Sequence, residues 1–345
     1  QGNAIYIVHA RTGQLIWKAT YGASTGAASA TQYTNAMMQH GIAAPVSPMD
    51  SDGDGILDRL YVADTGGRVW RVDLPEFVPG GTPAVTRTNS WKATVLADLR
   101  PADIATSTVN DLRFFHGATI VRRARDSIGV YDALYLGSGD REHPQSDTYD
   151  VTSGGTTTTV TKINWFFLLK DRLTTSGDSA VGSRTAVVPS DLLDVTDKCF
   201  SGSGTTCVSD TTSTSNNLEN GWRLKLEGLG EKNLSEPFIG GEGVIFTTYL
   251  PRGTSPDDKP CLPLGASRLY QVSLDDGSPL RFLHDVVGTS FSKTDRWINL
   301  YSGIDGGVVA VSPDFWITST GKSGGNPPQK PIRFYWRENG VDAVK

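Results

Sequence analysis

The sequence predicts an all-β fold, and three observations support this prediction. The 345 residues include 38 Gly and 18 Pro, so long helical patterns are scarce. Apolar residues occur in short runs bounded by Gly, Asp or Pro, a pattern typical of strands. A segment of strand, glycine-containing turn and strand also recurs along the chain.

The recurring segment predicts the arrangement of the strands. Its copies are Ile5–Trp17, Leu60–Val72 and Leu269–Leu283. Further strand candidates are Ala133–Gly139, Trp165–Leu173, Gly243–Leu250 and Gly306–Ser319. Hairpins spread over the chain without alternating helices leave sandwiches, solenoids and propellers, and the distance between copies favours radial blades whose edges are hidden. We expect residues 1–345 to form a single domain, a modified β-propeller with irregular blades and long loop insertions.

Two insertions interrupt the blade pattern, at residues 146–161 and 201–217. Both are rich in Ser, Thr and Gly and have few apolar residues to bury. Such composition predicts mobile surface loops. In the first insertion, Thr156–Thr161 has the alternative of extending an exposed hairpin.

Charge and hydropathy exclude two classes of partner. The formal net charge is −5 and no basic cluster is present, which argues against nucleic-acid binding. The longest strongly apolar run, Trp165–Leu169, is far shorter than the roughly 20 residues of a membrane helix. The chain begins with Gln and enters a strand pattern at once, so we interpret it as a soluble fragment or processed chain.

The three cysteines indicate whether the protein works in an oxidising or a reducing compartment. Cys199 and Cys207 bracket a polar loop, and a disulfide there would stabilise the fold by roughly 2 to 3 kcal/mol. The alternative is two reduced loop thiols. A disulfide predicts an oxidising compartment, with Cys261 left free or paired outside this chain.

The segment "DSDGDGILD" at residues 50–58 is the strongest motif in the sequence. It predicts a calcium site with ligands Asp50, Asp52, Asp54, the Ile56 carbonyl and Asp58. Alternate residues of a loop wrapping a cation point inward, and Gly55 permits the sharp turn. Hard oxygen ligands in this number select Ca²⁺ over Zn²⁺ and Mg²⁺.

The acidic loop is not an EF-hand. An EF-hand has Glu at position 12, where this chain has Tyr61, and two flanking helices, where it has a strand pattern. We therefore expect a nine-residue variant closed by Asp58 in a β context. Calcium bound to such a loop has either a structural role, in which it stabilises the fold, or a regulatory role, in which the loop acts as a sensor. Both alternatives stay open.

Two other motifs look catalytic, but their contexts argue against it. Gly321–Gly325 satisfies GxSxG without the strand, tight turn and helix of a nucleophile elbow. Gly137–Pro144 gathers acidic and basic residues that we interpret as a polar loop between strands. The tryptophans in apolar runs are expected to lie in blade cores. We predict no catalytic residue and no enzymatic activity.

Several segments in order resemble the C-terminal region of the PilC/PilY family of type IV pilus tip adhesins. They are "SPMDSDGDGILDRLYVADTGGRVWRVDL", "LYLGSGDREHP", "NWFFLLKDR", "GWRLKL", "EKNLSEPFIGGEGVIFTTYLP", "CLPLGASRLYQVSLDDGSPL" and "YWRENG". The resemblance implies a modified propeller with one calcium loop, whose ligands fall on the residues named above. It further implies a role in pilus biogenesis, extension and retraction, with minor pilins and a host or abiotic surface as partners. The protein would be exported through the periplasm to the pilus tip and cell surface.

Part of the family pattern is missing, and two rival functions remain. Some family members carry an RGD tripeptide, whereas this chain has Thr254 at the Asp position. Ala10–Trp17 is similar to blade motifs of quinoprotein dehydrogenases, which hold pyrroloquinoline quinone with calcium. Those enzymes often carry vicinal cysteines, and this chain has none. A carbohydrate-binding propeller is the third possibility.

Overall fold

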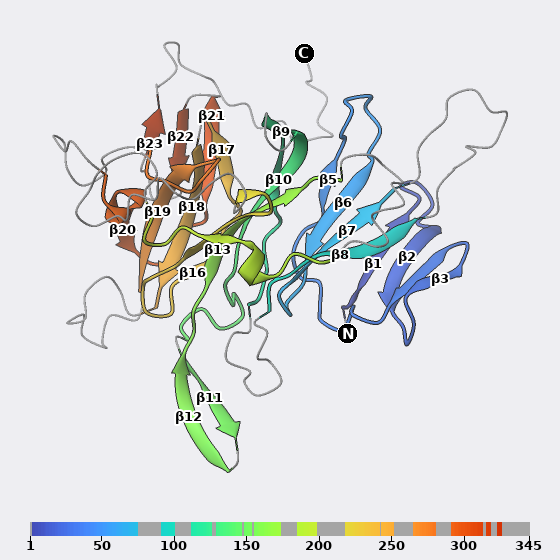
Figure 1. The fold of residues 1–345 in the computed structure, drawn as a ribbon, viewed down its shortest axis with the longest axis horizontal. Coiled ribbons are helices and arrows are strands. Elements are labelled where there is room, and N and C mark those ends of the chain that lie inside the picture. Colours follow the sequence, from blue (N-terminus) through green and yellow to red (C-terminus); the bar gives the residue numbers. More distant parts are fainter. Residues whose placement is uncertain are drawn as a thin grey trace, which may run out of the picture.

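The fold was obtained as a computed structural model, and its described residues form β-sheets joined by loops and short 3-10 turns (Figure 1). The structure describes residues 2–74, 91–100, 112–125, 129–146, 148–153, 155–173, 185–198, 218–241, 243–251, 265–280, 291–312, 315–318 and 323–325. None of the helices in these ranges is long and apolar enough to cross a membrane. The fold is all-β, as the sequence predicts.

The first two sheets each contain four strands. The first sheet has the order β1-β2-β4-β3 and consists of β1 (Ala4–Val8), β2 (Leu15–Tyr21), β3 (Gly26–Ser29) and β4 (Gln32–Asn35). The second sheet is antiparallel in chain order and consists of β5 (Ser47–Met49), β6 (Arg59–Ala63), β7 (Arg68–Asp73) and β8 (Lys92–Asp98).

The remaining sheets follow in chain order. The third, with order β14-β15-β13-β10-β9, contains β9 (Thr119–Arg125), β10 (Gly129–Gly137), β13 (Trp165–Asp171), β14 (Leu193–Asp194) and β15 (Gly221–Lys225). The fourth contains β16 (Lys232–Asn233), β17 (Phe238–Gly240), β18 (Gly243–Leu250), β19 (Ala266–Ser273) and β20 (Trp297–Ser302). The fifth contains β21 (Val308–Ser312), β22 (Phe315–Thr318) and β23 (Ser323–Gly325).

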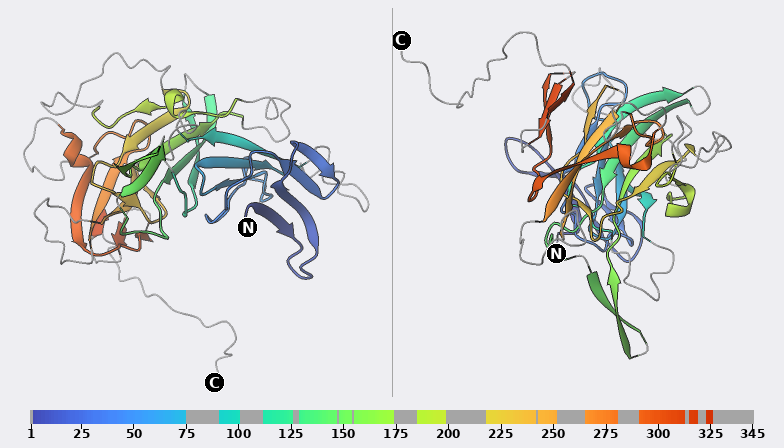
Figure 2. Two further views of the ribbon diagram at one scale, coloured as in Figure 1. Left: turned by 90° about the horizontal axis from the view of Figure 1, so that it is seen from below. Right: turned by 90° about the vertical axis from the view of Figure 1, so that its left-hand side faces the viewer.

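Apart from a sixth, two-stranded sheet described below, the sheets follow one another along an arc, from β1–β4 at one end to β21–β23 at the other (Figure 2). An apolar cluster fills each interface between successive sheets. At the interface of the third and fourth sheets, the rings of Phe166 and Phe246 stack with centroids 3.8 Å apart. Interior strands are therefore covered on both faces, and every residue of β7 and β18 is buried.

The predicted hairpins and strands are largely confirmed. The first two repeat copies form β1–β2 and β6–β7, and the third supplies β19 and the turn after it. Their turn glycines Gly13, Gly67 and Gly277 have φ of +69°, +89° and +67°. Such φ values favour glycine, which explains why each copy carries one in its turn. The further strand candidates correspond to β10, β13, β18 and the β21–β22 pair.

Of the six tryptophans whose burial the structure describes, three are fully buried, as predicted for blade cores. Trp17, Trp70 and Trp222 are at most 2 % exposed, whereas Trp165 is partly buried against the core between the second and third sheets. Burial of apolar side chains between the sheets stabilises the fold by about 25 cal/mol per Å².

The loop predicted at residues 146–161 is a β-hairpin in the structure, and the mobility of this segment stays a prediction. Within it, β11 (Thr148–Ser153) and β12 (Thr156–Thr161) pair antiparallel and project from the body of the molecule (Figure 1). Thr is β-branched and favours strands even where no apolar face is available to bury. Gly155, with φ of +80°, supplies the turn. The alternative of an exposed hairpin was the correct one.

Some sequence predictions fall outside the described residues. The second insertion at 201–217, the three cysteines and Thr254 all lie there. The disulfide and the mobility of that insertion stay predictions.

Candidate metal centre and the buried charges beneath it

The acidic segment forms the loop between β5 and β6. These strands pair with Met49 opposite Arg59, so residues 50–58 lie between the last residue of one strand and the first of the next. The backbone N–H of Asp58 donates to the carbonyl of Met49 at 3.0 Å, and the Asp58 carbonyl accepts from the N–H of Leu74 at 2.8 Å. Both ends of the loop are therefore fixed to the second sheet.

Three of the predicted ligands come together. Carboxylate oxygens of Asp50, Asp52 and Asp54 all lie within 4.8 Å of one another. Carboxylates at such a separation repel by about 1 kcal/mol per pair in water. None of the ion pairs between described residues involves these three side chains. A cation would offset this repulsion.

Backbone N–H groups shape the loop around its carboxylates. Gly53 and Gly55 donate to the two carboxylate oxygens of Asp50 at 2.7 and 2.9 Å. These hydrogen bonds, that from Gly55 most of all, hold the pKa of Asp50 below its usual value. Gly53 and Gly55 have φ of +81° and +87°, which glycine adopts without strain. The loop turns sharply twice, as Gly55 in the motif predicts.

The other two predicted ligands are placed differently. Asp58 is not part of the three-carboxylate group, and its Oδ2 accepts the N–H of Ser51 at 2.6 Å. The backbone N–H of Ile56 donates to Asp54 Oδ1 at 2.7 Å. Ligation by Asp58 and by the Ile56 carbonyl stays a prediction.

The donor set fits a hard divalent cation. Every side chain of the three-carboxylate group offers oxygen, the donor that Ca²⁺ prefers, and none offers sulfur or imidazole nitrogen. Two of the three carboxylates are exposed and one is half-buried, so an ion can reach them from solvent.

A second acidic group already has basic neighbours. Asp140, Glu142 and His143 also place ligand atoms within 4.8 Å of one another. Here Arg113 lies 3.6 Å from Glu142 and Lys162 lies 3.7 Å from Asp140. Asp140 also accepts the N–H groups of Glu142 and His143, at 3.0 and 3.1 Å. The group lies in the loop after β10, in keeping with the polar loop that the sequence predicts.

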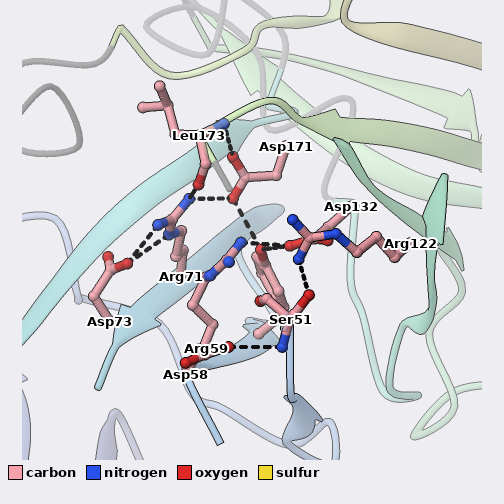
Figure 3. A network of polar contacts seen from close by, with 10 residues as sticks. Ser51, Asp58, Arg59, Arg71, Asp73, Arg122, Asp132, Asp171 and Leu173 are labelled. Carbon is pink, nitrogen blue, oxygen red and sulfur yellow. Dashed lines mark hydrogen bonds and ion pairs between the residues drawn. The ribbon is translucent and has the colours of Figure 1, made fainter. Parts of the chain in front are cut away.

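A network of buried charges lies directly beneath the acidic loop (Figure 3). Arg59, the first residue of β6, forms an ion pair with Asp132 of β10, and both side chains are 0 % exposed. The hydroxyl of Tyr61 donates to Asp171 at 2.9 Å and to Asp132 at 3.3 Å. Arg71 Nη1 donates to Asp171 at 2.7 Å. Strands of the second sheet thus meet strands of the third through paired charges.

The loop itself joins this network through Ser51. Arg122 of β9 donates a hydrogen bond from Nη1 to the Ser51 carbonyl (Figure 3). Ser51 is 7 % exposed and separates the first two carboxylates of the loop. The third sheet therefore contacts the backbone of the candidate metal centre directly.

Burial has the largest effect on the pKa values of Asp132 and Tyr61 in this network. Burial raises the pKa of Asp132, and the guanidinium of Arg59 opposes this rise without cancelling it. Burial likewise raises the pKa of Tyr61 well above its usual value. Asp132 Oδ1 is buried without a hydrogen-bond partner, so any disturbance of Arg59 leaves this carboxylate poorly compensated.

The structure was compared with known proteins. No protein-family model and no curated protein sequence matches the chain. A crystal structure of the PilY1 C-terminal domain from Pseudomonas aeruginosa is similar with a TM-score of 0.58 and 17% sequence identity, over 95% of this chain and 67% of that chain. The chain shares the fold of the PilY1 C-terminal domain. At the level of the fold, this finding confirms the resemblance to the PilC/PilY family that the sequence motifs indicate.

Within this PilY1-like fold, the acidic loop is predictable from the sequence, whereas the pairing of the buried charges next to it was not predicted. The sequence does contain a signal for them, because charged residues begin, interrupt or end runs that otherwise have the pattern of buried strands: Arg59, Arg71, Asp132 and Asp171. A charged residue in such a run has to be paired if it is buried. The pattern indicates a buried charge without indicating its partner.

Proposed function

We propose that this chain is a calcium-binding component of type IV pili, acting in pilus biogenesis and surface attachment. The observation that carries the proposal is the PilY1-like fold over 95% of the chain. The PilC/PilY motifs of the sequence support the same assignment. We further propose the finer description: a modified β-propeller, exported, located at the pilus tip, without enzymatic activity, and bound to minor pilins and to a host or abiotic surface.

The acidic loop would hold the ion. Carboxylates of Asp50, Asp52 and Asp54 supply the ligands that the structure brings together, and the Ile56 carbonyl and Asp58 complete the proposed set. Bound calcium would supply positive charge that offsets the repulsion among these carboxylates.

The protein's own residues would transmit this binding to the fold. Asp58 immediately precedes Arg59, and Tyr61 follows Arg59 by two residues. Arg59 and Tyr61 both donate to the buried Asp132. A loop that closes around the ion fixes the start of β6 and therefore the position of Arg59 between the two sheets. Loss of the ion would loosen the contact between the second and third sheets at Arg59. Residues on the surface of either sheet would then become less ordered.

The test uses the full-length gene in the bacterium that makes the protein. Cells carrying Asp54→Asn with Asp58→Asn are expected to assemble fewer surface pili and to show reduced twitching and attachment. Glu142→Gln, in the charge-compensated acidic group, is the matched control and is expected to behave as wild type. Pili are counted by electron microscopy, and protein level is checked by immunoblot. Normal pili in a strain that lacks the whole gene would refute the pilus role.

A further inference from the structure

Ser51, the second residue of the acidic loop, is held from two sides. Its N–H donates to Asp58 Oδ2 at 2.6 Å, and its carbonyl accepts from Arg122 Nη1. Both contacts are made by backbone atoms, so they fix the path of the chain between Asp50 and Asp52. The orientation of two candidate ligands depends on this peptide.

Arg122 connects that peptide to the buried charges. It lies directly opposite Asp132 in the pairing of β9 with β10. Asp132 forms the buried ion pair with Arg59, which follows Asp58 in the chain. Hydrogen bonds therefore join Asp58 to Ser51 and Ser51 to Arg122, strand pairing places Arg122 opposite Asp132, and the ion pair of Asp132 leads back to Arg59, the residue after Asp58 (Figure 3).

We propose that Arg122 is a positioning residue for calcium, which preorganises the acidic loop by holding the Ser51 carbonyl and couples ion binding to the buried Arg59–Asp132 pair. This inference rests on the proposed calcium function. Arg122 does not touch the ion. It limits the conformations that the empty loop adopts, so less conformational entropy is lost when calcium binds.

The coupling acts in both directions. If Arg122 and the buried pair favour the binding-competent loop, bound calcium must favour the intact pair by the same factor. Calcium would then stabilise the junction between the second and third sheets beyond the loop itself. Through the same contacts, calcium binding at the acidic loop would also affect a surface of the third sheet.

The neighbouring residue provides a matched control. Arg123 lies on the same strand with the same charge, and it forms an ion pair at 2.9 Å with the exposed Asp275, away from the acidic loop. Arg123→Met therefore removes an equal charge without touching Ser51. A general effect of net charge on calcium affinity would appear equally in both variants.

The experiment is a calorimetric calcium titration of the purified chain and its variants, each checked for folding by circular dichroism. Arg122→Met is expected to weaken calcium binding about tenfold, which equals about 1.4 kcal/mol, because it removes the hydrogen bond of a charged donor to the Ser51 carbonyl. Arg123→Met is expected to stay within twofold of wild type. Arg122→Lys keeps a cationic donor and is expected to bind more tightly than Arg122→Met. If Arg122→Met does not fold, Arg122→Gln makes the same comparison.

A double-mutant cycle separates positioning from general loosening of the fold. In the Asp132→Asn background, the effect of Arg122→Met on calcium affinity is expected to shrink at least threefold, since the buried pair is already disturbed. Wild-type affinity in Arg122→Met would overturn the positioning role, and equal losses in both backgrounds would overturn the coupling to the buried pair. Either result would leave the calcium site standing. No calcium binding by the wild-type chain would overturn the site and the inference together.

Discussion

Arg59 and Asp132 form an ion pair with both side chains 0 % exposed, although 73 residues separate them in the sequence. The pair joins β6 of the second sheet to β10 of the third. Taking two charges out of water costs several kcal/mol per ion, which the pairing and the surrounding hydrogen bonds have to offset. Removal of one partner would therefore leave the other charge buried and uncompensated.

Arg59→Met is expected to destabilise the fold by about 3–5 kcal/mol, since it isolates the carboxylate of Asp132. Urea unfolding followed by tryptophan fluorescence measures this change. Arg172→Met is the control, because the Arg172–Glu219 pair is more than 40 % exposed and such pairs contribute less than about 1 kcal/mol. Adding Asp132→Asn to Arg59→Met should recover part of the loss. A loss in Arg59→Met no larger than in the control would contradict the importance of the buried pair.

The partly buried His116 predicts a dependence of stability on pH. Burial lowers the pKa of His116 to about 4, with Arg141 acting in the same direction, whereas the unfolded value is about 6.5. The unfolded chain therefore binds the proton more readily, so stability is complete above about pH 6.5 and falls as the pH drops toward 4.

The expected loss across this window is about 1–3 kcal/mol, reduced from the full shift for solvent screening. Urea titrations at pH 7 and pH 4.5, both in chelator, measure it. His116→Gln removes the titrating group and is expected to flatten this part of the profile. An equally steep profile in the variant would show that other groups cause the acid sensitivity.

Local patterns in the sequence were sufficient to predict several parts of this structure. The turn glycines at Gly13 and Gly67 predict hairpins because their backbone needs positive φ, a property of two or three adjacent residues. The three carboxylates that come together were predicted from alternate spacing within five residues, from Asp50 to Asp54. In both cases the residues that determine the feature are neighbours in the chain.

Long-range pairing could not be predicted in this way. Arg71 pairs with Asp171 at a separation of 100 residues, and Arg122 reaches Ser51 at a separation of 71. Many charged residues were available as partners, and only the packing of the second sheet on the third selects among them. The Thr-rich hairpin β11–β12 differs from the predicted loop for another reason. Its lack of apolar residues suggested a loop, but backbone pairing and the strand preference of Thr are enough to form it.

The β11–β12 hairpin provides a test of modularity. Its strands pair only with each other among the described residues, and Thr148 lies opposite Thr161 at its base. Replacing residues 149–160 with Asn-Gly, a two-residue hairpin turn, is expected to leave the midpoint of thermal unfolding within about 3 °C of wild type. Calcium affinity should also be unchanged. A failure to fold would show that the hairpin supports the body of the molecule.

Asp54→Asn distinguishes a true ion site from an acidic turn, because its effect on stability is expected to change sign with calcium. In chelator, the variant loses one repelling charge from three carboxylates whose oxygens lie within 4.8 Å, so its free energy of unfolding should equal or exceed that of wild type. With calcium at 100 times the wild-type dissociation constant, the wild-type chain gains about 2.7 kcal/mol that the variant lacks. Thermal unfolding in chelator and in calcium measures both effects. Glu142→Gln should respond to calcium as wild type does, since its acidic group is already compensated by Arg113 and Lys162. If wild type and Asp54→Asn gained equally from calcium, the ion would bind elsewhere, and the carboxylates of residues 50–58 would serve only to shape a solvated turn.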